Sequence, residues 1–526
     1  MENKKMKIIS IASIIALALT LVTATYAFFV AQTGEGAQTD IKINANTVDT
    51  FTFEAGSALN LSLNQENFAS GKGNQTGTTF AKAMLTANNK TNTATEHYYL
   101  YLNISNNTFT YSIDNNTPEI LLSIKDGSNN EITSVSGLTY KTVTDGKGAS
   151  IKGFDITTKS GLITILNNRE ITTTSTKTEQ WNVTVTFVNY NANQAGNAGK
   201  RFSAKLMIQQ EKILTVLSDV CTSGNNLATC ITTLSNKSEP SIVNIYHHDS
   251  SLANGARDNS YRYAGANPNN FVCFGTTESP CPTDNLYRII GVINDKVKLI
   301  KYDYMTTDEL GTDGDYSQTY KEWGMDSTYK GTYGDGERIG VYFWNKDAST
   351  NTWSTSLLNK TNLNTNFINY LGTTWANKIA TVTWKVGGNT WANIGAKTSS
   401  VAYTNEITNP VTTNTTDNAT TYSAKIGLMY VSDYGFAASP DAWTLTMSSY
   451  NNTTATNNNW MYMGLYEWTV SRNADYSNYA FFVDYVGFVD GVNVGFDYGV
   501  RASFNLESSV SYVSGSGSMS DPIVIN

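Results

Sequence analysis

Hydrophobic and polar residues alternate along several stretches in the first part of the chain. Tyr99–Ile104, Trp181–Val188 and Phe202–Ile208 each place apolar side chains at every second position, as strands with one buried face do. Turn-forming residues separate such stretches, as in Asp145–Gly148. Because long helical periodicity is absent, we predict a mainly β protein that begins with an antiparallel, jelly-roll-like β-sandwich over residues 28–211.

The spacing of apolar residues changes to that of helices between residues 212 and 241. Ile213 and Leu217 mark one predicted short helix, and Leu227 and Ile231 mark a second one. We therefore predict that residues 212–241 form a short helical connector between two domains.

Residues 242–526 combine both patterns. Leu357, Leu363 and Leu371 recur at helical intervals, which predicts one or two helices packed on a sheet. The stretches predicted as strands are Leu286–Ile293, Val297–Tyr302, Ile426–Val431 and Val500–Leu506. This combination predicts an α+β domain.

The N-terminus has the pattern of an export signal. Lys4, Lys5 and Lys7 precede the apolar run Ile8–Val22, and small residues before Phe28 suit cleavage after Ala27. Residues 1–27 are thus predicted as a signal peptide. The alternative is an uncleaved anchor, since the apolar run continues to Val30. Either interpretation places the rest of the chain outside the cytoplasm, at the cell surface or in the extracellular space.

The composition of the chain limits the kinds of partner that the protein can be expected to bind. Charged residues make up 15% of the chain, aromatic residues 12%, and the net charge is −8 without any basic run. Nucleic-acid binding needs clustered Lys and Arg, so nucleic acid is excluded as a partner. A membrane is expected to be contacted only through the N-terminal segment, if that segment is retained.

The four cysteines form two close pairs, Cys221 with Cys230 and Cys273 with Cys281. In an exported protein such pairs predict disulfides. Zinc binding is the alternative, but three histidines and these spacings do not match a tetrahedral site.

Tyr, Asn, Asp, Phe and Gly are concentrated between Trp460 and Val510. Rigid aromatics and small polar residues are typical of recognition surfaces, so we predict a binding surface there. Alternation over Phe482–Val489 would direct every second side chain outward, and Trp468 and Arg501 are predicted as its scaffold. The candidate ligand-binding residues are Asn473, Asp475, Tyr476, Tyr479, Asp484, Tyr485, Phe488, Asp490, Asn493, Phe496 and Asp497. The alternative is an ordinary Tyr-rich hairpin pair with solvated loops.

Residues suited to catalysis or metal binding are few. No catalytic residue is predicted, because nucleotide-binding, hydrolase and metal-spaced histidine motifs are missing from the sequence. His247 and His248 are predicted to be solvated in a polar loop. No cofactor is expected except a structural calcium ion, for which Asp308, Asp313 and Asp315 offer hard oxygen ligands. A plain turn is the alternative for that segment.

The segment Thr23–Ile43, TATYAFFVAQTGEGAQTDIKI, resembles the N-terminus of the TasA and camelysin family of exported Gram-positive matrix-fibre proteins. The resemblance implies a jelly-roll-like sandwich, export through a dedicated signal peptidase, and self-assembly in which the segment from Phe28 completes a neighbour's sheet. The chain departs from the family after Phe29, where it reads Val-Ala-Gln-Thr.

Residues 260–526 resemble a family of uncharacterised exported domains of Firmicutes and wall-less bacteria, related to the C-type-lectin and formylglycine-generating-enzyme fold. The motifs that carry the resemblance include Cys273–Gly275, Leu286–Val292, Gly427–Gly435, Tyr466–Thr469 and Gly499–Leu506. The resemblance implies a lectin-like fold whose variable face precedes a fixed ending. In lectin-fold proteins diversified by retroelements, such a face is rich in Asn, Asp and Tyr.

Together these observations predict a secreted or cell-surface bacterial protein whose C-terminal lectin-like domain, residues 242–526, recognises a glycan or protein of a host or bacterial surface. One alternative is a structural subunit of an extracellular matrix fibre that assembles through the sandwich. Another is a divergent extracellular hydrolase, which would show clustered carboxylates with perturbed pKa values in a deep cleft.

Overall fold

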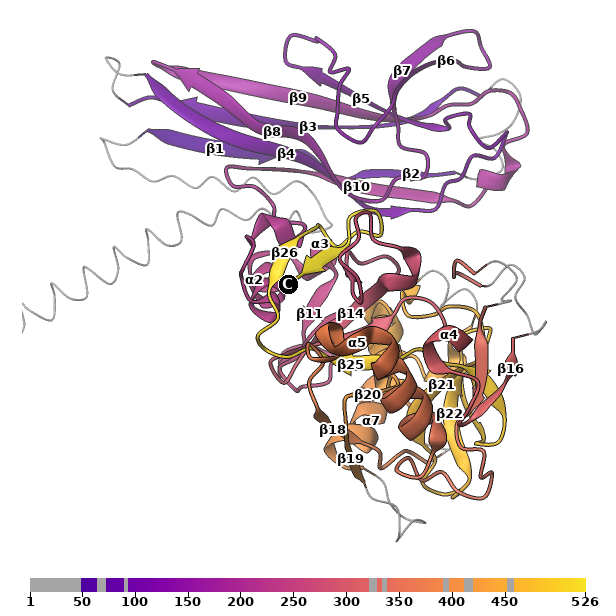
Figure 1. The fold of residues 1–526 in the computed structure, drawn as a ribbon. Helices are drawn as coiled ribbons and strands as arrows, with labels where there is room; N and C mark the ends of the chain where they lie inside the picture. Colours follow the sequence, from indigo (N-terminus) through magenta and orange to yellow (C-terminus); the bar gives the residue numbers. More distant parts are fainter. Residues whose placement is uncertain are drawn as a thin grey trace, which may run out of the picture. The chain divides into compact units, whose positions relative to one another are not determined.

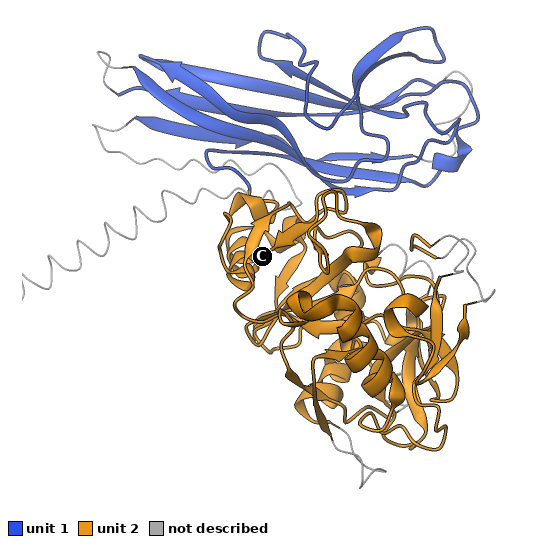
Figure 2. Ribbon diagram, in the orientation of Figure 1, with its two compact units in different colours: residues 1–213 blue, residues 214–526 orange. Residues whose placement is uncertain are grey.

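In a computed structural model of the protein, alternating stretches of the sequence form the strands of several sheets (Figure 1). The structure describes residues 49–63, 72–88, 93–320, 329–333, 338–390, 397–410, 420–451 and 458–526. The chain divides into two units, Met1–Ile213 and Leu214–Asn526 (Figure 2). The predicted signal peptide, residues 1–27, lies outside the described residues.

The first unit contains two antiparallel sheets. One has the strand order β1-β3-β9-β5-β7-β6, and the other has the order β2-β10-β4-β8. The strands are β1 (Thr50–Ala55), β2 (Leu59–Ser62), β3 (Gln75–Thr86), β4 (Ala94–Asn107), β5 (Ile120–Asp126), β6 (Tyr140–Thr144), β7 (Ser150–Asp155), β8 (Gly161–Thr173), β9 (Thr176–Phe187) and β10 (Arg201–Gln209).

Alternation produces the core between these sheets. In β9, Trp181, Val183 and Val185 are buried at every second position, and they share one hydrophobic cluster with Phe202 and Ala204 of β10. The mainly β fold with an N-terminal antiparallel sandwich is confirmed.

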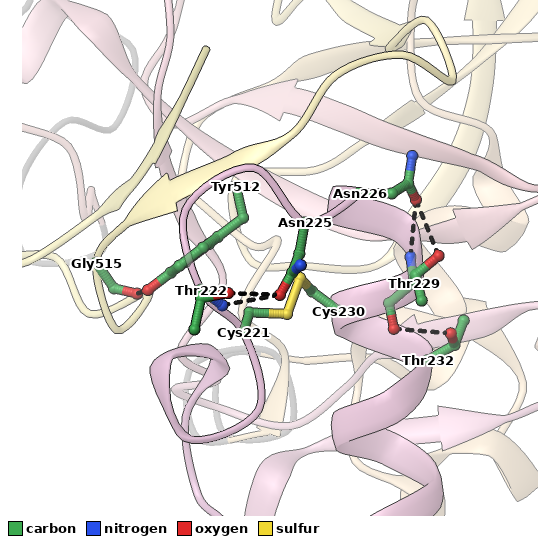
Figure 3. The surroundings of a disulfide bond; sticks show 9 residues. All are labelled: Cys221, Thr222, Asn225, Asn226, Thr229, Cys230, Thr232, Tyr512 and Gly515. Atoms are coloured by element: carbon green, nitrogen blue, oxygen red, sulfur yellow. Dashed lines mark hydrogen bonds between the residues drawn. A yellow bond between two sulfur atoms is a disulfide. The ribbon is translucent and has the colours of Figure 1, made fainter.

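The second unit begins with a disulfide-closed loop (Figure 3). Cys221 is bonded to Cys230 in helix α2 (Leu227–Lys237), whose first turn is capped by the Asn226 side chain accepting from the Thr229 amide at 2.9 Å. In Figure 3 the Asn225 side chain accepts from the Thr222 amide inside the same loop.

The structure corrects the prediction for residues 212–241. Only a 3-10 turn, Leu217–Asp219, forms where the first helix was expected, because the Asp219 carboxylate accepts from the Thr215 and Val216 amides and caps the segment. Leu217 and the buried face of α2 belong to the main core of the second unit. The segment is therefore part of that unit and not a separate connector.

Two larger sheets and a two-stranded ribbon form the second unit. The first sheet follows the order β20-β25-β15-β14-β13-β27-β26, with β12 pairing β14 and β11 pairing β12; the second follows β16-β17-β24-β21-β22-β23; β18 pairs β19. The strands are β11 (Ile245–His247), β12 (Tyr261–Tyr263), β13 (Phe271–Cys273), β14 (Leu286–Ile293), β15 (Lys296–Lys301), β16 (Tyr316–Thr319), β17 (Gly340–Phe343), β18 (Val382–Lys385), β19 (Thr421–Ala424), β20 (Ile426–Gly427), β21 (Glu467–Arg472), β22 (Tyr479–Val483), β23 (Val489–Asn493), β24 (Asp497–Gly499), β25 (Ser503–Asn505), β26 (Tyr512–Ser514) and β27 (Ile523–Ile525).

Helices accompany these sheets, as the α+β pattern predicted. The longest helical segment of the described residues runs from the π-helical η5 (Leu358–Phe367) into α5 (Ile368–Ala376), where a kink at Gly372 (φ 70°) interrupts the helix. Besides α2 and α5, the described residues of this unit form the α-helices α3 (Pro240–Val243), α4 (Thr307–Leu310), α7 (Ser399–Tyr403) and α8 (Val431–Ala437). Within the described ranges, no helix combines the length and apolar character needed to cross a membrane.

The predicted strand Ile426–Val431 is shorter than expected. Only Ile426 and Gly427 pair with β25, and α8 begins at Val431. The Glu406 carboxylate accepts from the Val431 and Ser432 amides, each at 3.0 Å, and these bonds favour the start of a helix over continued strand pairing.

Both predicted disulfides are present. Cys221–Cys230 has a Cα–Cα distance of 5.7 Å, and Cys273–Cys281, which ties the end of β13 to the segment before β14, has one of 5.9 Å. Two disulfides indicate a non-reducing environment.

Candidate binding surface

The Tyr-rich stretch forms four of the six strands of the sheet β16-β17-β24-β21-β22-β23, namely β21 to β24. Trp468 of β21 lies opposite Phe482 of β22, and Phe482 lies opposite Asp490 of β23. Residues directly opposite in neighbouring strands project from the same face of a sheet. These three side chains therefore define one face, and the alternate positions Glu467, Phe481 and Val489 define the buried opposite face.

Four aromatic rings cover the first face and make what we call the aromatic surface: Tyr466, Tyr485, Phe496 and Tyr498. Tyr466 and Tyr498 are stacked with ring centroids 5.0 Å apart and an interplanar angle of 16°. The Tyr485 ring lies 5.3 Å from Tyr466, and the Phe496 ring lies 6.4 Å from Tyr498. Tyr485 is 37% exposed and Phe496 52% exposed, so both ends of the row meet solvent.

Beneath these rings, Trp468 is fully buried and supports them. Its ring centroid lies 4.7 Å from that of Tyr498, and its Nε1 donates to the Tyr342 carbonyl at 2.8 Å. Arg501 holds the adjacent buried carboxylate, with Nε donating to Glu467 Oε1 at 2.7 Å and Nη2 donating to Oε2 at 2.8 Å. The scaffold beneath the aromatic surface is thus fixed in position by directional bonds.

Carboxylates lie beside the aromatic surface. Burial raises the pKa of Asp484, and Asp490 raises it further. Burial and the neighbouring Asp484 also raise the pKa of Tyr466 to about 12. At the other end, Asp497 accepts hydrogen bonds from Ser317 Oγ at 2.7 Å and from Gln318 Nε2 at 3.1 Å. The surface can therefore offer ring faces for apolar contact and carboxylate oxygens as hydrogen-bond acceptors.

Several candidate residues lie away from this surface. Asn473 is buried, and its side-chain oxygen accepts from the amides of Asp475 and Tyr476, so it shapes the loop after β21. The Tyr476 ring lies beside that of Tyr479 at the start of β22, with ring centroids 5.3 Å apart and an interplanar angle of 40°. Asn493 Nδ2 donates to the Ala348 carbonyl at 3.3 Å.

The prediction that every second side chain over Phe482–Val489 points outward is wrong, because the chain turns between β22 and β23. The amide of Asp484 donates to the Phe488 carbonyl, and the amide of Gly487 donates to the Asp484 carbonyl, each at 2.8 Å. The Asp484 side chain also accepts from the Val486 amide, and Gly487 has a φ of 102°, which suits glycine. Asp484 is consequently buried and Phe488 half-buried, while Tyr485 lies at the tip of the turn.

Sequence reasoning missed three contributors to this site. Tyr466 precedes β21 and was noted only as part of a family motif, and Ser317 and Gln318 come from β16, far from the Tyr-rich stretch in sequence. No local pattern around β16 signals that it reaches Asp497, since that contact depends on pairing through β17.

The structure does not gather the carboxylates predicted as calcium ligands. Asp315 is buried, and its oxygens accept from the Lys346 amide at 3.0 Å and the Leu358 amide at 2.7 Å. Asp313 accepts from Asn366 Nδ2 at 2.6 Å, and Asp308 lies in α4. Among the residues that the structure describes, no group of three or more His, Cys, Asp or Glu side chains could hold a metal ion. The acidic segment therefore forms hydrogen-bonded turns.

The expectation that both histidines are solvated is wrong for His248, which is fully buried. Its Nδ1 accepts from the Ala256 amide at 3.0 Å, and its ring lies 4.8 Å from Phe436 and 5.1 Å from Trp443. Burial, followed by the positive charge of Arg262, lowers the pKa of His248 to about 3. The ring packs as a neutral core residue.

Comparison with known proteins adds no relative. No family model, curated protein or solved structure matches the chain.

Proposed function

We propose that the protein is a recognition protein of the cell surface or extracellular space, which binds a glycan or protein partner through the aromatic surface. The observation that carries this proposal is the row of four rings on a sheet face, of which Tyr485 and Phe496 are exposed. Exposed aromatic groups beside hydrogen-bonding side chains are typical of sites that bind a partner without catalysing a reaction.

The packing of the rings supports tight binding. Because Tyr466 and Tyr498 stack on each other and Tyr498 packs against Trp468, they lose little conformational freedom when a ligand covers them. Ring faces suit the C–H faces of sugars or apolar side chains of a protein, and Asp490 and Asp497 are placed to accept hydrogen bonds from hydroxyl or amide groups.

Export and the family resemblances favour the same role. The two disulfides suit a protein outside the cytoplasm, as does the predicted signal peptide over residues 1–27. The resemblance of residues 260–526 to exported lectin-like domains supports recognition as the function of the second unit.

A second candidate function is a fibre subunit that assembles through the first unit. The observation that favours it is the edge strand β8, which has 13 residues and pairs only with β4 in the described part of the sheet. Such an edge can accept a strand from another copy. Concentration-dependent growth of filaments from the purified full chain would support assembly, and a particle that stays monomeric at high concentration would refute it.

Binding by the aromatic surface can be tested on glycan and surface-protein arrays with the full chain and a Tyr485→Ala/Phe496→Ala variant. Central aromatic contacts contribute about 2 kcal/mol or more each, so we expect the double variant to lose at least about 100-fold in affinity. Tyr370→Ala is the matched control, because Tyr370 is 48% exposed in α5, outside the surface.

The control and the double variant should unfold at the same denaturant concentration as the parent protein. Binding that survives in the double variant, or that is lost equally in Tyr370→Ala, would contradict the assignment. If the full chain binds no component of either array, the recognition function is rejected and the fibre-subunit function is favoured instead.

A further inference from the structure

A second feature of the second unit is a pocket of about 370 Å³ with a positively charged wall. Its walls include Phe271, Arg288, Tyr302, Trp460 and Met463, and Lys330 lies at its side. Pockets for small molecules span roughly 300–1,000 Å³, so this one is suited to a single substituted ring and not to an extended chain.

Arg288 places a buried positive charge in the wall of the pocket. The residue is 6% exposed, and its guanidinium donates to the Asn270 side chain at 2.7 Å and to the Trp460 and Pro268 carbonyls, each at 3.2 Å. These acceptors are neutral and use three of the five N–H donors of the guanidinium. No carboxylate of the described residues forms an ion pair with it.

Several other buried cations of this unit are each paired with a carboxylate. Arg501 pairs with Glu467 at 2.7 Å, Lys298 pairs with Asp433 at 2.5 Å, and Lys301 with Glu309 at 2.5 Å. Burying a charge without a counter-charge is unfavourable, so a buried guanidinium on a pocket wall is a position where an anion would be stabilised.

Lys330 adds a second positive charge. Burial and the repulsion of Arg288 lower the pKa of Lys330 to about 8, which leaves the ammonium mostly charged at neutral pH. Burial lowers the pKa of Arg288 to about 9, so the guanidinium is charged as well. An anion between the two groups would relieve their repulsion.

The uncharged residues of the pocket walls indicate what kind of molecule the anionic group belongs to. The rings of Phe271 and Trp460 lie 4.3 Å and 4.6 Å from the Arg288 guanidinium carbon, so flat apolar faces flank the charge. Asn267, Asn269 and Ser518 at the rim supply amide and hydroxyl groups. Flat faces, polar rim groups and a positively charged wall match a hydroxylated ring that bears one carboxylate.

We propose that this pocket binds a single carboxylated sugar ring, with the carboxylate held by Arg288 and Lys330. The residues that line the pocket do not include the four rings of the aromatic surface, and the inference goes beyond the proposed function without resting on it.

The test is ligand-observed NMR titration of the full chain with glucuronate, galacturonate and N-acetylneuraminate, beside glucose, galactose and inorganic phosphate. We expect at least one acidic sugar to bind, its neutral counterpart to bind at least tenfold more weakly, and Arg288→Gln and Lys330→Gln each to reduce the affinity at least tenfold. Binding should weaken as the pH rises through about 8, where Lys330 loses its proton, and Lys330→Gln should lack this dependence.

Lys360→Gln, which removes the same charge from an exposed position of η5, should bind as the parent does. If Arg288→Gln fails to fold, Lys330→Gln decides the question. Failure of all three acids to bind, equal binding of acidic and neutral sugars, or equal binding of phosphate would overturn the proposal. If acidic-sugar binding is lost in Tyr485→Ala/Phe496→Ala but kept in Lys330→Gln, the sugar binds at the aromatic surface. That result would also overturn the proposal that the pocket binds it.

Discussion

Asp433 is the residue whose charge we expect to matter most for the stability of the second unit. It accepts from Arg262 Nη1 at 3.0 Å and from Lys298 Nζ at 2.5 Å, and all three side chains are almost completely buried. Burial alone would raise the pKa of Asp433, but Lys298 and Arg262 outweigh burial, so the pKa lies below its usual value. The carboxylate therefore stays ionised at neutral pH.

Asp433→Asn keeps the shape of the side chain and removes its charge. Arg262 retains Asp258 at 2.9 Å, but Lys298 loses the one carboxylate with which it forms an ion pair in the described structure. Breaking a buried ion pair from one side costs about 3–5 kcal/mol, because the remaining charge stays buried without a partner. The matched control is Asp284→Asn, whose partner Arg338 is 49% exposed, and we expect it to cost at most about 1 kcal/mol.

Urea unfolding followed by tryptophan fluorescence measures both variants. Trp181 is the one tryptophan before residue 214, so the signal reports mainly on the second unit. Adding Lys298→Met to Asp433→Asn should restore at least about 1 kcal/mol, because it removes the unpaired cation. The reasoning is refuted if Asp433→Asn costs no more than Asp284→Asn, or if Lys298→Met destabilises the unit further.

The remaining predictions concern a buried acid and the disulfides. Burial raises the pKa of Glu406 from 4.5 to about 7, so its contribution to stability is present below about pH 4.5 and is lost as the pH rises through about 7; Glu406→Gln should flatten that dependence in urea unfolding at a series of pH values. Cys221→Ser/Cys230→Ser should lower the free energy of unfolding by about 2–3 kcal/mol, the loop-closure contribution for cysteines nine residues apart. An unchanged pH profile would contradict the first prediction, and a midpoint equal to that of the parent protein the second.

Where one face of a strand or helix is buried, the local sequence was sufficient to predict that element. Trp181, Val183 and Val185 alternate because β9 has a core on one side and solvent on the other, and this contrast is what a period of two records. The helix around Leu363 and Leu371 was found for the same reason. Both disulfides were predicted from close cysteine pairs in a chain with the pattern of an export signal.

Sequence alone could not predict which Tyr-rich side chains face solvent. Composition located the stretch, but the turn between Asp484 and Phe488 reverses the chain where alternation continues, so Asp484 is buried and Tyr485 exposed. Burial of His248 beneath Phe436 and Trp443 likewise depends on residues almost 200 positions away, which no local pattern records.

Arg288 illustrates the same limit for the pocket. It lies within β14, where seven of the eight residues are buried, and a strand buried on both faces shows no periodicity to set one side chain apart. Its significance comes from comparison with the paired cations Arg501 and Lys298, and pairing is a tertiary property.

These buried pairs also support the proposed binding by a surface that is built from short strands. Arg262 and Asp433 join segments 171 residues apart, and Arg501 and Glu467 join the end of β24 to the start of β21. Such contacts favour one arrangement of the strands, since any other arrangement would separate a buried charge from its partner. β21 and β24 therefore hold Trp468, Tyr498 and the adjoining Tyr466 in place, and the contact that we propose with the exposed rings would stabilise a complex with little loss of conformational entropy.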